Sequence, residues 1–320
     1  MNANFSLPLT NGFKRMKKAL FQPFEITKWI NVGFTAFLAG LADCSSGGGG
    51  GGRNSGMNFK DINWDEFFNF PETAWEWLIS HPFWFSLIIT GVLLLISIAI
   101  VLSWLNSRGK FMFLYNVVHD RDEVVFPWNE FRKQGNSLFW WRFFYDMFIF
   151  ALFILFSIYC FGVFKNIHNE LIPKVATFSF VVGIILTLIG LLTLNGYITL
   201  FLNDFVVPIM FKHHLSATRA WSKFLMLAVH NMGSFFVYGL FVFVLYIAVA
   251  LAVIIISVMT CFIGLLLIMI PFIGTIVLLP VSYTFRTFSI EYLAMFGNEF
   301  NLFPVQNDNQ INKPPIELTD

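Results

Sequence analysis

The chain has 320 residues, of which 57% are hydrophobic and only 12% are charged. Soluble domains usually contain about 45–50% apolar and about 25% charged residues, so this composition excludes a monomeric water-soluble fold. The net charge of +1 provides no basic field, and no nucleic-acid partner is expected. We therefore predict an all-α polytopic membrane helix bundle, with the lipid bilayer as its principal partner.

The first apolar stretch, Trp29–Ala42, has 14 residues and contains Asn31. A full span needs about 20 apolar residues, so on length alone this stretch fits an interfacial or re-entrant helix as well as a short span. Basic residues precede it and Cys44 follows it, as in a signal peptide with a lipidation site. The Asp beside the cysteine and the interrupting Asn favour a membrane segment over cleavage.

Residues 43–81 are predicted to form a Gly-rich, acidic outer loop. Six consecutive glycines, Gly47–Gly52, indicate a flexible tether. Pro71 is typical of the first turn of a helix, and Trp75 and Trp77 suit a surface helix at the level of the lipid headgroups. The simpler interpretation is a membrane anchor, and the sharper one is a lid over a pathway.

Uncharged runs locate the longer spans. Residues 83–105 carry no charge, residues 143–164 carry only Asp146, and residues 175–202 are again uncharged. From Phe224 to Phe285 there are 62 residues without Asp, Glu, Lys or Arg, enough for a helix of about 93 Å, so this run must fold back as two spans. Gly264, with Thr260 and Cys261, offers the turn.

The basic residues decide the topology, because cytoplasmic loops retain Lys and Arg. If Trp29–Ala42 crosses the membrane, 16 of the 20 basic residues lie inside; if it does not, the division is 11 to 9. The first arrangement is favoured. It predicts about six membrane segments, the first one short or partly inserted, with both termini cytoplasmic, in the cytoplasmic (inner) membrane.

Residues 106–142 are predicted to form a basic, amphipathic inner loop. Its first helix begins near Lys110 and rests its apolar side on the membrane, and a second helix begins near Trp128. Four of its cations are candidates for contacts with anionic lipids: Arg108, Lys110, Arg132 and Lys133. The plainer alternative is that these cations only enforce topology.

A second polar group is expected where the spans reach the inner leaflet. Intramembrane carboxylates are functional candidates by default, and Asp204 lies four residues before Pro208, where a helix is expected to end or break. The alternative is structural pairing, such as that of Arg142 with Asp146 at i,i+4 spacing. The candidate cluster consists of Arg142, Asp146, Asn203, Asp204, Arg286 and Glu291.

Signals for catalysis and cofactors are weak. No metal motif is present, His213 and His214 are adjacent rather than at i,i+4 spacing, and no cofactor is expected. Cys44, Cys160 and Cys261 all fall on the predicted outer side without a paired spacing. Residues 1–300 are expected to form one integral membrane domain, and residues 301–320, rich in Asn and Pro, a disordered tail.

Several stretches resemble an uncharacterised family of multi-pass bacterial and archaeal membrane proteins, similar to the membrane domain of glycerophosphodiester phosphodiesterases. The matching residues are Leu20–Leu41 with the glycine tract, Asn116–His119, Pro127-Trp128, Gly135–Phe139 and Asp204–Met210. The resemblance implies a membrane fold and no activity, and no phosphodiesterase domain is present.

These observations favour a non-enzymatic membrane protein that acts through lipid partners, a protein partner or a homo-oligomer in envelope maintenance or assembly. The alternative is a transporter, channel or lipid-translocating protein with a pathway near the inner-leaflet charges. A membrane-embedded enzyme ranks third, because no nucleophile with its base is visible. A polar cavity beside Asn195, Asn203 and Asp204 would favour transport, and an apolar, closed bundle would oppose it.

Overall fold

The computed structural model describes residues 5–41, 64–168 and 174–303, and all regular structure within these ranges is helical, as predicted. The first half of the chain contains α1 (Ser6–Phe21), α2 (Ile26–Gly40), α3 (Trp64–Ser80), α4 (Pro82–His119), α5 (Val125–Glu130) and α6 (Arg132–His168). The second half contains α7 (Lys174–Phe201), a π-helix (Leu202–Val206), α8 (Val207–His213), α9 (Ala217–His230), α10 (Met232–Met259), α11 (Ile263–Met269), α12 (Pro271–Val277), α13 (Leu279–Ala294) and a short 3₁₀ turn (Asn298–Phe300).

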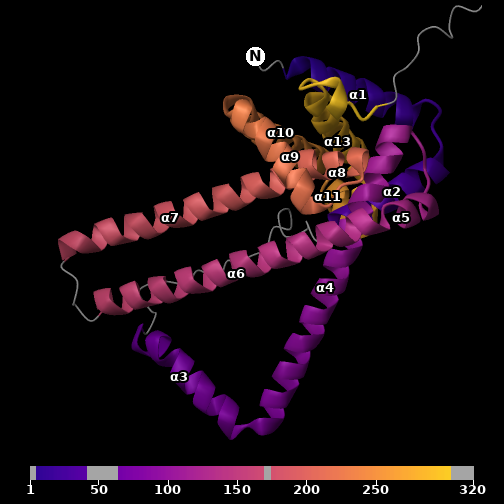
Figure 1. Ribbon diagram of the computed structural model, residues 1–320. Helices are drawn as coiled ribbons and strands as arrows, with labels where there is room; N and C mark the ends of the chain where they lie inside the picture. The colour runs from indigo at the N-terminus through magenta and orange to yellow at the C-terminus, as the bar shows by residue number, and fades with distance from the viewer. Residues whose placement is uncertain (1–4, 42–63, 169–173, 304–320) are drawn as a thin grey trace, which may run out of the picture.

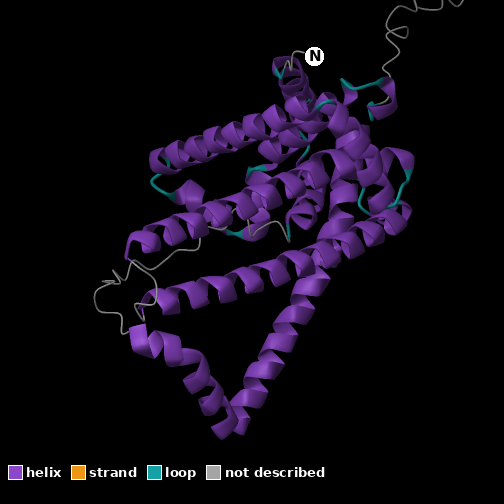
Figure 2. Ribbon diagram, turned by 60° about the vertical axis from the view of Figure 1, so that its left-hand side comes forward, coloured by secondary structure: helices purple, strands orange, loops and turns teal. Residues whose placement is uncertain are grey.

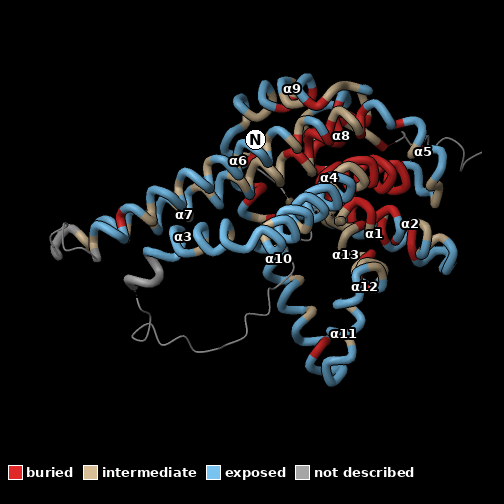
Figure 3. The backbone as a smooth tube through the Cα atoms, turned by 90° about the horizontal axis from the view of Figure 1, so that it is seen from below, coloured by how far each residue is buried: buried red, intermediate tan, exposed pale blue. Residues whose placement is uncertain are grey.

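The buried residues gather in one core. Figure 3 shows them concentrated on α1, α2, α8, α13 and one half of α4, while the long projecting helices are mostly exposed. Stacked and edge-on aromatic rings fill much of this core: Phe205, Phe224, Phe235, Tyr238 and Tyr292 are each at most 2% exposed and contact one another. Part of the aromatic content therefore packs in the core, while many other rings are exposed on the projecting helices.

Each of the four long helical segments, with α7, the π-helix and α8 counted as one segment, is divided into a core part and a projecting part. The projecting halves of α4, α6 and α7 leave the core in Figures 1 and 2, and α10 does so in Figure 3. The most apolar 18-residue windows of the four long segments have a mean hydropathy of 2.4 to 3.1, yet at most 6% of any window is buried. Such a surface is stable only against lipid or another apolar partner.

Among the described residues, four helical segments are long and apolar enough to cross a membrane, and a fifth results if α12 and α13, bent by 63°, count as one span. The remaining predicted segment, which is the first in chain order, corresponds to α2, whose 15 residues extend only about 22 Å. α2 is shorter than a full span and is not among the candidate spans of the described residues.

The predicted inner loop is wrong in its first half. Residues 106–119 do not form a separate helix on a membrane surface, because α4 continues unbroken to His119 and this stretch is buried. Asn106, Ser107 and Lys110 are at most 1% exposed, and their polar groups find partners within the core. A polar stretch ended the apolar run in the sequence without ending the helix.

Two turns differ in their agreement with expectation. The reversal predicted near Gly264 is confirmed: α10 ends at Met259, and Cys261 and Phe262 adopt left-handed φ values of 51° and 65°. Pro71, expected in a first turn, instead lies inside α3, at the expense of one backbone hydrogen bond. The glycine tract, Cys44 and nearly all of the 301–320 tail lie outside the described residues.

Candidate functional site

The candidate site is centred on the π-helix between α7 and α8. In this register the N–H of Val207 bonds to the carbonyl of Leu202, five residues earlier. The next bond of the series would join residue 208 to the carbonyl of Asn203, but Pro208 has no N–H. The sequence therefore leaves the Asn203 carbonyl without a backbone partner at a point where the helix is already wider.

Arg286 supplies the missing donor. Its Nη1 lies 2.6 Å from the Asn203 carbonyl oxygen, and it reaches there from α13, 83 residues away in sequence. Lys110 of α4 donates from Nζ to the Asn203 side-chain oxygen at 2.5 Å. One residue of the π-helix thus joins three segments that are distant in the chain.

Asp204 faces the same group of cations. Its Oδ2 accepts a 2.9 Å hydrogen bond from the hydroxyl of Tyr238, a fully buried residue of α10. The positive charges of Arg286 and Lys110 attract this carboxylate electrostatically. Asn203, Asp204, Lys110, Arg286 and Tyr238 form what we call the π-site, at the junction of α4, α7, α10 and α13.

The other predicted cluster members are placed elsewhere. Arg142 of α6 donates to the side-chain oxygen of Asn106, and the Asn106 amide donates to the Ala39 carbonyl at 2.6 Å. Asn106 lies one α4 turn before Lys110, so this second network runs beside the π-site. Asp146 is exposed on α6.

Glu291 does not join the π-site. Its carboxylate pairs with Arg15 of α1 at 2.6 Å, and the Arg15 guanidinium also lies 3.7 Å from the centre of the Phe303 ring. This pair attaches α1 to the end of α13.

The four proposed lipid contacts divide into two pairs. Arg108 is 7% exposed, donates to Asn136, and lies over the rings of Trp104 and Trp128. Lys110 is 1% exposed and is engaged at the π-site. Burial makes both unsuitable as headgroup contacts, since that role needs an exposed cation. Arg132 and Lys133 are exposed and keep that expectation open.

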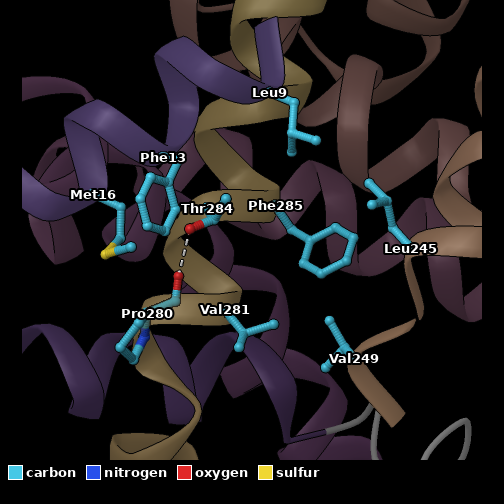
Figure 4. Close-up of a pocket in the computed structure, with 9 residues that line it drawn as sticks. All are labelled: Leu9, Phe13, Met16, Leu245, Val249, Pro280, Val281, Thr284 and Phe285. Carbon is cyan, nitrogen blue, oxygen red and sulfur yellow. Dashed lines mark hydrogen bonds between the residues drawn. The ribbon is translucent and has the colours of Figure 1, made fainter. Parts of the chain in front are cut away.

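Two cavities lie at the edges of the core, and neither is lined by Asn203 or Asp204. The first, of about 220 Å³, is an apolar hollow between α1, α10 and α13, with Phe13, Leu245 and Phe285 on its walls (Figure 4). The Thr284 hydroxyl in its lining donates to the Pro280 carbonyl at 2.7 Å, so it is engaged within its own helix. The second, of about 590 Å³, lies between α6 and the start of α9.

The arrangement is suited to holding helices together. Within the described ranges no group of three or more His, Cys, Asp or Glu side chains is placed to hold a metal ion. Sequence reasoning missed Tyr238 and Asn106. Each is a polar side chain at or within an apolar run, a signal that was available without the structure.

The fold and its exposed apolar helices define a helical membrane protein. The chain belongs to a family of unknown function, DUF7544, whose model matches residues 8–300. No curated protein and no solved structure matches it, so the expected similarity to the membrane domain of glycerophosphodiester phosphodiesterases has no support.

Proposed function

We propose that this chain is a multi-pass protein of the cytoplasmic membrane that acts without catalysis, as a docking platform for lipids or proteins in envelope maintenance or assembly. The observation that carries the proposal is the division of each long helical segment into a projecting apolar part and a part packed into one polar-linked, aromatic core. A bilayer would cover the first part and leave the core at one face of the membrane.

The ion pairs support an even number of crossings. Lys28, near the start of α2, lies 2.9 Å from Asp120, which caps the far end of α4. The 38 residues of α4 extend about 57 Å, so the chain between Lys28 and Pro82 must pass from one end of α4 to the other. In a membrane, we take this passage as the first crossing.

The same reasoning supports a common side for the two ends of the described chain. Arg15 pairs with Glu291 near the end of α13, so α1 and the end of α13 share a face. A bilayer tolerates helix tilts of up to about 40°. The apolar halves of the long helices diverge in Figure 1. In a bilayer we therefore expect them to turn toward the membrane normal while the core keeps its packing.

The topology is tested by thiol labelling of a variant that lacks the three native cysteines. Single cysteines replace Ser80, at the end of α3, and Thr218, in the first turn of α9, both exposed. In intact cells an impermeant maleimide should label position 80 only, and after permeabilisation it should label both. Labelling of position 218 in intact cells would overturn the orientation.

The role is tested in cells that lack the protein. We expect reduced survival of osmotic downshift and detergent, restored by the wild-type chain. A π-site variant, Tyr238→Phe, that is made at normal levels should restore survival less well if the core holds the platform together. Normal survival of the deletion strain under both stresses would contradict an envelope role.

The alternative is transport, and the π-site is the observation that favours it. A carboxylate at a helix irregularity, bracketed by two cations, is typical of ion and substrate pathways. The two described cavities do not reach it, so we rank transport second. Flux or lipid scrambling by the purified protein in vesicles would reverse this order.

A further inference from the structure

The lining of the second cavity changes from polar at one end to apolar at the other, as the structure of a phospholipid does. It is a groove on α6, closed on one side by the first turn of α9, and six of its lining residues are Ser137, Trp140, Trp141, Phe144, Phe148 and Thr218. Trp140, Phe144 and Phe148 are 54%, 63% and 60% exposed, so the groove opens sideways. No other described segment covers these rings.

The α6 side of the groove is a single stripe on the helix. Spacings of three and four residues place Lys133, Ser137, Trp140, Phe144 and Phe148 on one face. The order along the stripe is cation, hydroxyl, indole, phenyl, phenyl. From Lys133 to Phe148 the helix rises about 22 Å, which equals half of a bilayer about 40–45 Å thick. The stripe therefore runs from headgroup level into the hydrocarbon of one leaflet.

Polar groups at the headgroup end of the groove can still donate hydrogen bonds. The Ser137 hydroxyl oxygen accepts a 3.0 Å bond from the Ala217 N–H, which leaves its own proton free to donate. Ser216, the residue before α9, makes no capping hydrogen bond, so the first-turn N–H groups of Thr218 and Arg219 lack a side-chain acceptor. Ser137 and Thr218 both line the cavity, so this end of the groove is its polar end.

The charge at this end is positive and uncompensated. Lys133 and Arg219 are both exposed, and neither forms an ion pair with any described residue. Arg132, the neighbouring cation, lies about 100° away around α6, off the face that carries Lys133. Each cation neighbours a lining residue of the groove: Lys133 lies one helical turn before Ser137, and Arg219 follows Thr218.

We propose that this groove binds one anionic diacyl phospholipid of the inner leaflet, a ligand of the phosphatidylglycerol type. The phosphate lies between Lys133, Ser137 and the first turn of α9, the ester region lies beside Trp140, and an acyl chain follows Phe144 and Phe148. Trp141 forms the rear wall, where it stacks on Trp221 with ring centres 5.3 Å apart. The inference rests on the proposed membrane orientation and names the lipid that the platform would hold.

The experiment uses the full chain in phosphatidylcholine nanodiscs with a small fraction of phosphatidylglycerol that carries a photoreactive group in its acyl chain. After illumination, peptide mapping should find adducts on residues 140–148. Unlabelled phosphatidylglycerol should displace the probe, whereas phosphatidylcholine and water-soluble glycerol phosphate should not. Displacement by glycerol phosphate would reveal a free phosphate site, and equal labelling by a phosphatidylcholine probe would reveal ordinary annular lipid; either result overturns the proposal.

Charge variants locate the headgroup. Each cation near a membrane surface contributes about fivefold to the affinity for anionic lipid, so Lys133→Gln and Arg219→Gln should each weaken competition about fivefold, and the double variant roughly 25-fold. Arg132→Gln is the matched control and should weaken competition less than Lys133→Gln. An equal loss in the control would refute the site. If position 218 proves external in the labelling experiment, the orientation fails; if it is internal and adducts are absent from α6, the lipid site alone fails.

Discussion

The close contact of α4 with α2 in the core provides a sharp test of the fold. Gly109 of α4 faces the backbone of α2, and a Cβ built at this position would lie 2.5 Å from the Leu38 carbonyl carbon and 2.6 Å from the Ala39 nitrogen. Both are backbone atoms that no rotamer change can move. Because ordinary contacts begin at 3.4 Å, Gly109→Ala must displace α2 by about 1 Å, which is overpacking of the kind that costs about 1–3 kcal/mol.

The displacement also breaks a hydrogen bond. The Asn106 amide donates to the Ala39 carbonyl at 2.6 Å, and a shift of about 1 Å lengthens this contact to about 3.6 Å, beyond hydrogen-bonding range. Leaving the buried amide unsatisfied costs about 1–3 kcal/mol. Alanine regains about 1 kcal/mol of helix propensity over glycine, so the expected net destabilisation is about 1–5 kcal/mol.

Gly91 is the matched control, because it lies in the same helix and a Cβ there meets nothing within 4 Å. We expect Gly91→Ala to be neutral or slightly stabilising. The assay is equilibrium unfolding in mixed detergent micelles, with the monodisperse fraction after heating as a second measure. Equal stability of the two variants would refute the packing of α2 against α4, and with it the argument that places Lys28 at the far end of α4.

Three further predictions concern the polar contacts. Arg286→Ala should lower the free energy of unfolding by about 1–3 kcal/mol, because it leaves the Asn203 carbonyl without a hydrogen-bond donor. In a Pro208→Ala background, residue 208 regains an N–H that can bond to this carbonyl, so Arg286→Ala should then cost less. Full additivity of the two substitutions in the double-mutant cycle would contradict this account. Asp204→Asn keeps the fold, since the amide oxygen still accepts from Tyr238, and it should abolish flux or scrambling in vesicles only if the chain transports; unchanged flux would remove Asp204 from the pathway. The Lys223 side chain donates a hydrogen bond that holds the pKa of the Glu299 carboxyl below its ordinary value of 4.5. This contact therefore stabilises the folded state fully above about pH 4.5, and the stabilisation disappears as the pH falls through the lower pKa that Glu299 has in the folded state. Glu299→Gln should flatten this part of the profile of stability against pH, and an unchanged profile would exclude the contact.

Several features were available from the sequence because they depend on local composition. The uncharged runs gave the projecting halves of α4, α6, α7 and α10, since about 20 apolar residues suffice to define a span wherever they occur. The polar residues around Thr260 gave the turn after α10. The Asn203-Asp204 pair with Pro208 indicated an irregular helix, because a missing N–H has the same consequence in any fold.

The prediction from sequence was wrong about the exposure of the charged residues in the core. Arg108 and Lys110 read as surface cations, because burial of a cation depends on partners that arrive from elsewhere in the chain. For Arg108 those partners are Asn136 and two tryptophan rings, and for Lys110 the partner is Asn203, 93 residues away. No local pattern encodes such pairings.

What the sequence determined by itself is the class of protein and the identity of its spans, because a scarcity of charge and the length of apolar runs are properties of each segment alone. Only the tertiary structure decided which polar residues meet. It assigned Glu291 to Arg15, Arg142 to Asn106, and Arg286 to the carbonyl that Pro208 leaves free. Each of these contacts joins residues from helices distant in the chain, and the packing of one helix against another sets which donor reaches which acceptor.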